Sequence, residues 1–217
     1  MTRLSLLLAS LVVALFAFPF LYARQRHETY RNFRVVEDGV LYRSGQMSPS
    51  GIARVCREKG IKTVISLRDE GKQADDVQDE EAVCRNAGVL EYETIPPKVW
   101  EEDGTGMVPM TANLDRFLLN LEAKTEDPKT GELTPVYPRP ILIHCFAGIH
   151  RTGAHVAVYR VRYHRYTPAE AVAELKACGK PTTTYVGNLI PFLSTRYLPE
   201  LYERVHGVPV GGAGGGR

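Results

Sequence analysis

Hydrophobic and polar positions divide the chain into regions of different character. Leu4 to Tyr22 form a run of 19 residues without a charged side chain, and Arg3 carries the only charged side chain before it. Beyond a polar stretch, short apolar runs alternate with segments of helical periodicity, and the chain ends in a glycine-rich sequence. The expected organisation is therefore an apolar N-terminal segment (1–23), a linker (24–34), one globular domain (35–206) and a flexible tail (207–217).

The apolar N-terminal segment is long enough to cross a membrane. As a helix, 19 residues extend about 28 Å, close to the thickness of the hydrocarbon core of a bilayer. A cleaved signal peptide, with export of the domain, is the alternative, but neither Ala17 nor Ala23 has the small residue two positions earlier that cleavage favours. We expect a single-pass anchor, and the arginines that follow it favour a cytoplasmic domain.

The domain is predicted to alternate strands with helices. Short apolar or β-branched runs predict strands at residues 40–42, 62–67, 90–95 and 141–143. Caps and periodicity predict helices from Ser48-Pro49 to Gly60, over 76–87 before Gly88, from a Thr111 cap, over 154–163 and from the capping box Thr167-Pro168-Ala169-Glu170. This order predicts an α/β fold with a central, mostly parallel sheet flanked by helices. Residues 124–140 are polar and rich in Pro, Thr and Gly, and are expected to form an excursion on the surface.

Composition excludes several classes of function. The 217 residues include 27 basic and 25 acidic side chains, a net charge of +2, so no broad basic surface is available to bind nucleic acid. The four cysteines are widely spaced and form no C-x2-C pair, which argues against a disulfide scaffold and against a zinc site of the usual spacing. Cys56, Cys84 and Cys178 are expected to be buried packing residues.

The ten residues from His144 to Gly153, HCFAGIHRTG, lie between a predicted strand and a predicted helix. A loop in this position points backbone N–H groups inward and ends at the positive end of a helix, which suits an anion. Gly148 permits a tight wrap, and Arg151 offers a planar fork for two phosphate oxygens. In such a field the thiolate form of Cys145 is favoured, so we expect a nucleophile directed at phosphorus.

This loop resembles the HCxxGxxRT signature of the cysteine-dependent protein tyrosine and dual-specificity phosphatases. The similarity extends upstream through residues 39–46 and 60–68, which look like the atypical dual-specificity branch of plants, fungi and bacteria, and runs from about residue 33 to residue 197. The resemblance implies a dual-specificity-phosphatase-like fold and a two-step reaction through a phosphocysteine, without a metal or an organic cofactor.

The resemblance also implies a role for each residue of the loop. Cys145 is the nucleophile, Arg151 binds phosphate and stabilises the transition state, and Thr152 donates a hydrogen bond to the leaving thiolate. His144 orients the loop. The residues expected to bind the substrate are those of the wrap itself: Phe146, Ala147, Gly148, Ile149, His150 and Arg151.

The family also requires a general acid that protonates the leaving oxygen. Asp103 is the predicted acid, because it lies 42 residues before Cys145 and is followed by a glycine on which the loop can hinge. Glu101 and Glu102 are alternatives, since no WPD pattern is present. Arg43 and Arg68 are expected to be structural partners of carboxylates.

Three functions are compatible with the sequence. The first is hydrolysis of phosphomonoesters on proteins, on phosphotyrosine and also on phosphoserine or phosphothreonine. The second is hydrolysis of a small phosphorylated substrate, an inositol (pyro)phosphate or a phospholipid, although Phe146 and Ile149 stand where lysines are common in loops for highly charged substrates. The third is a catalytically inactive phosphate-binding module, which retention of Cys145, Arg151 and Thr152 disfavours.

Overall fold

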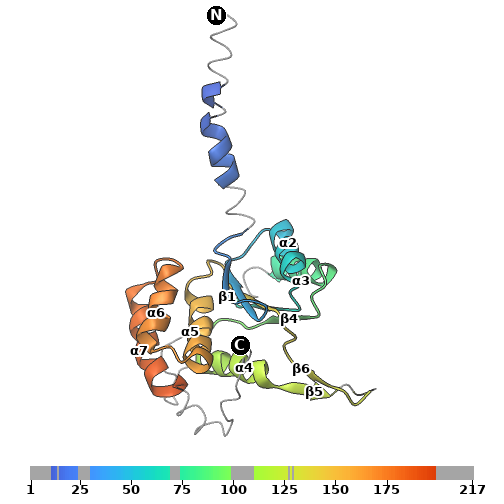
Figure 1. Cartoon of the computed structure of the whole chain (residues 1–217), viewed down its shortest axis with the longest axis vertical. Coiled ribbons are helices and arrows are strands. Elements are labelled where there is room, and N and C mark those ends of the chain that lie inside the picture. The colour runs from blue at the N-terminus through green and yellow to red at the C-terminus, as the bar shows by residue number, and fades with distance from the viewer. Residues whose placement is uncertain are drawn as a thin grey trace, which may run out of the picture.

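The computed structural model describes residues 11–13, 15–23, 30–68, 74–98, 110–126, 128 and 130–198. Within these ranges the chain forms a central sheet with helices on both faces (Figure 1). The predicted α/β class is therefore confirmed.

The central sheet has five strands in the order β1-β2-β7-β3-β4. β2, β7, β3 and β4 run parallel, and β1 pairs antiparallel with β2 at one edge. β7 is the middle strand and all four of its residues are buried, as expected for a short apolar run with helices on both faces. The strands are β1 (Arg34–Glu37), β2 (Leu41–Ser44), β3 (Thr63–Ser66), β4 (Glu91–Thr94) and β7 (Ile141–His144).

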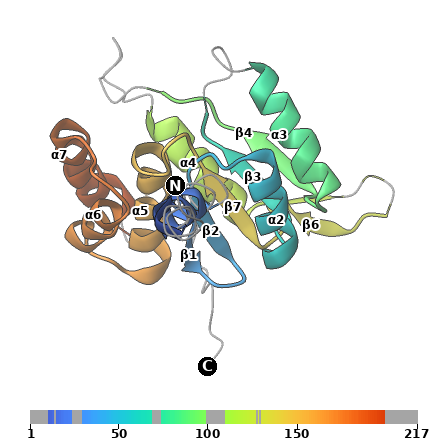
Figure 2. The same cartoon turned by 90° about the horizontal axis from the view of Figure 1, so that it is seen from above.

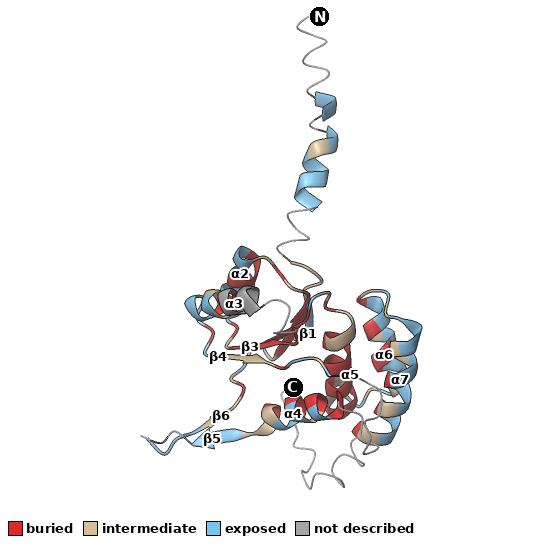
Figure 3. Cartoon of the chain, turned by 180° about the vertical axis from the view of Figure 1, so that it is seen from behind, coloured by how far each residue is buried: buried red, intermediate tan, exposed pale blue. Residues whose placement is uncertain are grey.

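The helices pack on the two faces of the sheet, α2 and α3 on one side and α4 to α7 on the other (Figure 2). Alternate residues of β7 serve the two sides, because Ile141 and Ile143 belong to one core cluster and Leu142 to the other. Figure 3 shows the buried residues gathered along the strands and on α5. The helices are α2 (Pro49–Lys59), α3 (Ala74–Asn86), α4 (Met110–Glu122), α5 (His150–His164), α6 (Pro168–Ala177) and α7 (Thr183–Phe192), followed by the π-helical turn η1 (Leu193–Tyr197).

Local sequence signals fix most helix ends as predicted. Ser48 accepts a hydrogen bond from the Gly51 amide at the start of α2, and Gly60 ends that helix with φ +63°. Both hydrogen bonds of the predicted capping box are present at Thr167 and Glu170. Thr111, however, is not the cap of α4: the helix begins at Met110, and Thr111 is buried within its first turn.

The structure adds detail in two places. The last residue of the expected linker, Arg34, is the first residue of β1 and pairs with Arg43 of β2. The expected surface excursion carries a second, mostly exposed sheet, in which β5 (Lys124–Glu126) pairs antiparallel with β6 (Leu133–Pro135). The backbone hydrogen bonds of both pairs depend on partners that a polar sequence pattern does not reveal.

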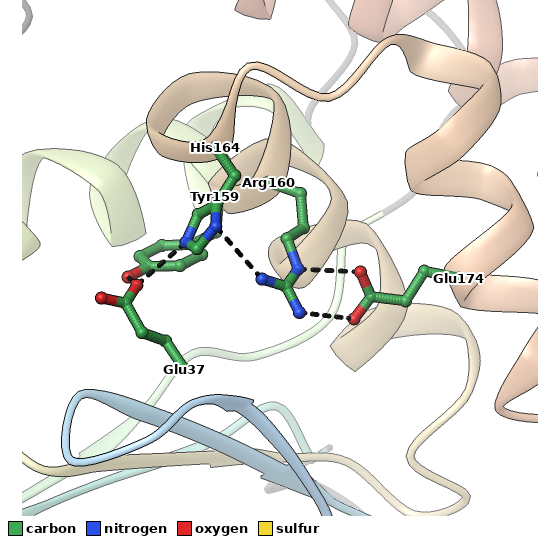
Figure 4. A network of polar contacts seen from close by, with 5 residues as sticks. All are labelled: Glu37, Tyr159, Arg160, His164 and Glu174. Atoms are coloured by element: carbon green, nitrogen blue, oxygen red, sulfur yellow. Dashed lines mark hydrogen bonds and ion pairs between the residues drawn. The ribbon is translucent and has the colours of Figure 1, made fainter.

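A polar network fastens the C-terminal end of α5 to β1 and α6 (Figure 4). The carboxylate of Glu37 accepts hydrogen bonds from the Tyr159 hydroxyl at 2.6 Å and from His164 Nε2 at 2.9 Å. Arg160 donates to His164 Nδ1 at 3.3 Å and binds both carboxylate oxygens of Glu174. Because a guanidinium only donates, His164 Nδ1 is the acceptor and its Nε2 carries the proton. The network holds α5 at the end remote from the predicted loop.

The predicted N-terminal segment and tail are described only in part. Residues 11–13 and 15–23 have helical backbone and exposed apolar side chains. Among the residues that the structure describes, no helix has both the length and the apolar character needed to span a bilayer. Residues 1–10, 14, 24–29 and 207–217 lie outside the described residues.

Candidate active site

The predicted loop lies at the carboxyl edge of the sheet, between β7 and α5. The register places Ser44 of β2 and Ser66 of β3 on either side of His144, the last residue of β7. Ile149 is the N-cap of α5 and provides no side-chain hydrogen bond to the first amides of the helix. These amides and the positive end of the helix are therefore directed at the loop without a capping side chain.

The carbonyl groups of the loop are held on its outer side by neighbouring segments. The Phe146 carbonyl accepts from the Gln46 amide at 3.0 Å, and the His144 carbonyl accepts from the Leu67 amide at 2.8 Å. Asn32 Nδ2 donates to the carbonyls of Ala147 and Gly148 at 3.2 and 3.3 Å. With their carbonyls engaged outside, the peptide groups of the wrap leave N–H groups for the inner side, as an anion cradle requires.

Position 148 requires glycine for two reasons, its backbone conformation and the lack of space for a side chain. Its φ is +70°, and a Cβ at this position would lie 2.5 Å from the amide nitrogen of Gly45 and 2.6 Å from the Ser44 carbonyl. No side chain fits there without moving the end of β2. The predicted need for glycine at this position is thus explained by the close approach of the loop to β2.

Cys145 is buried, with 4% of its surface exposed, and its Sγ accepts a hydrogen bond from the Gly148 amide at 3.2 Å. This is the charge-stabilising contact that a thiolate at this position needs. Arg151, at the start of α5, donates from Nη1 to the Leu67 carbonyl at 3.1 Å, which orients its guanidinium beside the loop. Thr152 is fully buried, and among the described residues its hydroxyl has no hydrogen-bond partner. The predicted hydrogen bond from Thr152 to Cys145 is thus not formed in this structure.

A buried ionic cluster supports the loop from behind. His144 Nε2 lies 2.9 Å from Oε1 of Glu80 on α3, and Arg68 Nη1 lies 3.5 Å from Oε2 of the same carboxylate. Tyr92 also donates a hydrogen bond to Glu80. Burial raises the pKa of Glu80, but the contacts with His144, Tyr92 and Arg68 outweigh burial and leave the pKa below its ordinary value. The carboxylate therefore stays ionised at neutral pH and orients His144.

Glu80 and Asn32 support the loop, and the sequence did not reveal either role. Glu80 lies among several acidic residues of α3, and nothing in the sequence distinguishes it from its neighbours. Asn32 lies in the expected linker and adopts φ +52°, a conformation that asparagine tolerates better than most residues. The prediction for Arg68 as the partner of a carboxylate is confirmed.

Arg43 contacts the loop directly, contrary to the prediction that it pairs with a carboxylate. Its Nη2 donates to the Gly148 carbonyl at 2.8 Å, and its side chain is 1% exposed. Nε and Nη1 have no hydrogen-bond partner among the described residues. Burial lowers the pKa of Arg43, while the nearby Cys178, Glu174 and Cys145 favour its charged form. A second cation therefore lies behind the loop, close enough to interact with Cys145.

His150 is placed against α7. Its Nε2 accepts a hydrogen bond from the Thr182 amide at 3.1 Å, and its carbonyl accepts one from the Tyr185 hydroxyl. Burial and the neighbouring Arg151 lower the pKa of His150, so its imidazole is neutral at neutral pH. The predicted contact of His150 with substrate stays a prediction.

The predicted general acid cannot be placed. Asp103, Glu101 and Glu102 all lie outside the described residues. Within the described ranges, no group of three or more His, Cys, Asp or Glu side chains is arranged to hold a metal ion.

Comparison with known proteins identifies one family. Residues 26–160 match the model of the tyrosine phosphatase family. A search of curated proteins gives no match.

Solved structures with the same fold include the core catalytic domain of the PP-IP phosphatase SIW14 from S. cerevisiae, with 17% identity, a TM-score of 0.51 and coverage of 81% of this chain and 91% of that one. A DUF442 protein of Shewanella putrefaciens CN-32 has 17% identity and a TM-score of 0.55 over 80% of this chain and 98% of its own. TpbA of P. aeruginosa has 19% identity and a TM-score of 0.51 over 78% of this chain and 91% of its own. These neighbours share the fold of the chain, with its mostly parallel sheet.

Proposed function

Because this chain belongs to the tyrosine phosphatase family and is a cysteine-dependent phosphatase, we propose that it hydrolyses phosphomonoesters of proteins, on phosphotyrosine and also on phosphoserine or phosphothreonine. The observation that carries the proposal is the arrangement around Cys145, whose sulfur accepts the Gly148 amide within a wrap of outward carbonyls. A phosphate in such a wrap meets N–H groups, the start of α5 and Arg151.

The proposed reaction proceeds in two displacements. Cys145 Sγ attacks phosphorus, the bond to the leaving oxygen breaks, and the electron pair stays on that oxygen while Asp103 gives it a proton. Water then attacks the phosphocysteine and gives a proton to the Asp103 carboxylate, the bond between sulfur and phosphorus breaks, and the sulfur leaves as a thiolate that the Gly148 amide stabilises. Arg151 binds two phosphate oxygens throughout and neutralises the charge that develops in each transition state.

The second candidate is an inositol (pyro)phosphate or phospholipid phosphatase. It is supported by the name of the fold neighbour SIW14, a PP-IP phosphatase. The loop argues for the protein substrate, because Phe146 and Ile149 add no charge and Phe146 is 53% exposed, where an aryl or peptide side chain can contact it. A substrate panel of phosphotyrosine and phosphoserine peptides, inositol pyrophosphates and phosphoinositides separates the two candidates.

The chemical class is tested by Cys145→Ser in the full chain. Serine lacks the acidity of the thiol, so we expect hydrolysis of an aryl phosphate to fall by at least about a thousand-fold. Cys56→Ser is the control, because it also replaces a sulfur atom by oxygen. Cys56 lies on α2, in the core between the sheet and helices α2 and α3, and we expect this variant to retain activity. Equal activity of the Cys145→Ser variant and the unmodified enzyme would contradict the proposal.

We also propose that residues 1–23 attach the enzyme to a membrane, with a cleaved signal as the alternative. The large apolar side chains described in this segment support attachment, because they are more than half exposed, for example Phe16 at 71% and Phe20 at 67%. An apolar surface of this kind is stabilised when a bilayer covers it.

A further inference from the structure

A pocket adjoins the outer wall of the catalytic loop. Its volume is about 360 Å³, and Arg31, Asn32, Ala147, Ile149 and Cys178 line it. Ala147 and Ile149 belong to the loop that is proposed to bind the scissile phosphate, so the pocket adjoins the proposed phosphate site. None of these lining residues is acidic.

Arg31 is fixed at the edge of this pocket by three contacts. Its carbonyl accepts a hydrogen bond from the Gly45 amide at 2.7 Å. A Cβ placed on Gly45 would lie 3.0 Å from Arg31 Cγ and 3.0 Å from the carbonyl carbon of Ala147, so the stem of Arg31 runs beside the loop. Its guanidinium carbon lies 4.2 Å from the centre of the Phe146 ring. The charge is therefore held over the loop rather than extended into solvent.

The guanidinium of Arg31 can bind a ligand while it stacks on Phe146. Stacking uses the flat face of the group and not its N–H edge, which is the edge that binds a carboxylate in two places. In the part of the chain that the structure describes, no carboxylate forms an ion pair with Arg31. Lys180, two residues after Cys178, is exposed on the same segment and adds positive charge.

We infer that Arg31 and this pocket form a subsite for an acidic side chain that flanks the phosphorylated residue of a peptide substrate. The inference rests on the proposed protein phosphatase activity and assigns its sequence preference. Phe146 provides an apolar surface for the peptide, and Arg31 pairs with the aspartate or glutamate beside the phosphorylated residue. The loop itself carries no lysine, so Arg31 supplies this charge from outside the loop.

The test compares three phosphotyrosine peptides that differ only in the flanking residue, which is Glu, Gln or Lys. For the unmodified full chain we expect kcat/KM to be about five-fold higher for the Glu peptide than for the Gln peptide, as for one well-placed and partly exposed ion pair. Arg31→Gln removes this preference, and Arg31→Glu reverses it in favour of the Lys peptide. The ratio between peptides is measured within each variant, so a general change in activity cancels.

Arg57→Glu is the matched control. It makes the same change of charge in the last turn of α2, which leads to the start of β3 and so lies at the opposite edge of the sheet from the loop. We expect this variant to keep the peptide preference of the unmodified chain, and high salt to reduce that preference.

Two outcomes overturn the inference while the proposed function stands. One is equal hydrolysis of the three peptides by the unmodified chain. The other is the same change of preference in Arg57→Glu as in Arg31→Glu, which would indicate a long-range effect of net charge. Hydrolysis of inositol phosphates but of no phosphopeptide would overturn both the proposed function and the peptide subsite.

Discussion

Two successive peptide groups at Gly148 connect buried donors to the nucleophile. In the first, the Ala147 carbonyl accepts from Asn32 Nδ2 at 3.2 Å and the Gly148 amide donates to Cys145 Sγ at 3.2 Å. A donor on the carbonyl polarises that peptide group and makes its amide a better donor to sulfur. In the second, the Gly148 carbonyl accepts from Arg43 at 2.8 Å, so Arg43 holds the backbone of the loop and acts on Cys145 through its own charge.

We predict that Arg43→Met lowers the activity of the enzyme. The variant loses the buried charge near Cys145 and the donor to the Gly148 carbonyl, so kcat/KM at neutral pH should fall about ten-fold. Arg43→Lys keeps the charge, and its kcat/KM should lie between those of the other two proteins. An unchanged kcat/KM in a folded Arg43→Met protein, with folding checked by circular dichroism, would rule out the role of Arg43.

Sequence reasoning found the site residues that are neighbours in the chain and missed those that meet only after folding. The loop from His144 to Thr152 is contiguous, so spacing alone carries its chemistry. Asn32 lies 116 positions from Gly148, and Glu80 is one acidic residue among several on its helix. Within the described ranges Arg43 contacts a backbone carbonyl and no carboxylate, and a carbonyl partner leaves no mark in the sequence.

Among the elements, α5 determines the geometry of the site, since it begins at the loop and is anchored along its length. Its far end is held by the network of Glu37, His164 and Arg160. Near its start, His155 is fully buried, with Nδ1 2.8 Å from the Arg151 carbonyl and its ring against Phe117 of α4. The carbonyl accepts, so Nδ1 carries a proton, and burial lowers the pKa of the imidazole and keeps it neutral at neutral pH.

The burial of His155 predicts a stability that depends on pH. Burial lowers the pKa of His155 to about 4, whereas the unfolded chain titrates near 6.5. Between these values the unfolded state binds a proton that the folded state does not, so stability is complete above about pH 6.5 and falls toward pH 4, by about 1.4 kcal/mol per unit at most. Urea unfolding at pH 7, 6 and 5 measures this slope.

His155→Asn is the matched variant for this prediction. Asparagine keeps a donor near the position of Nδ1 but does not titrate, so the variant should be less stable at pH 7 and show a flatter dependence of stability on pH. Parallel curves for the variant and the unmodified chain would show that His155 does not cause the slope.

The elements that the sequence predicted are those with local signals. The start and end of α2 follow from Ser48 and Gly60, which act within one helical turn. β5 consists of Lys124, Thr125 and Glu126, all exposed, and has no alternation of apolar residues to mark it. Its strand character comes from pairing with β6, which no local pattern contains.

At the scale of the whole molecule, the net charge does not reveal where the cations important for function lie. The net charge is +2, yet Arg31, Arg43 and Arg151 gather around one loop. The sheet brings these cations together, because the carboxyl ends of β2, β7 and β3 lie at one edge and the segment before β1 returns to the same place.

The apolar N-terminal segment gives the last prediction, which concerns the chain as a whole. If residues 1–23 insert into a bilayer, the full chain should sediment with vesicles of neutral phosphatidylcholine and stay bound in high salt, because insertion depends on apolar surface rather than on the arginines that follow. Phe16→Lys with Phe20→Lys places two charges in the apolar run, each costing about 3 kcal/mol in the bilayer, and should release the protein. Arg24→Gln with Arg26→Gln is the control and should stay bound. A full chain that remains in the supernatant would contradict the membrane attachment while leaving the phosphatase assignment unaffected.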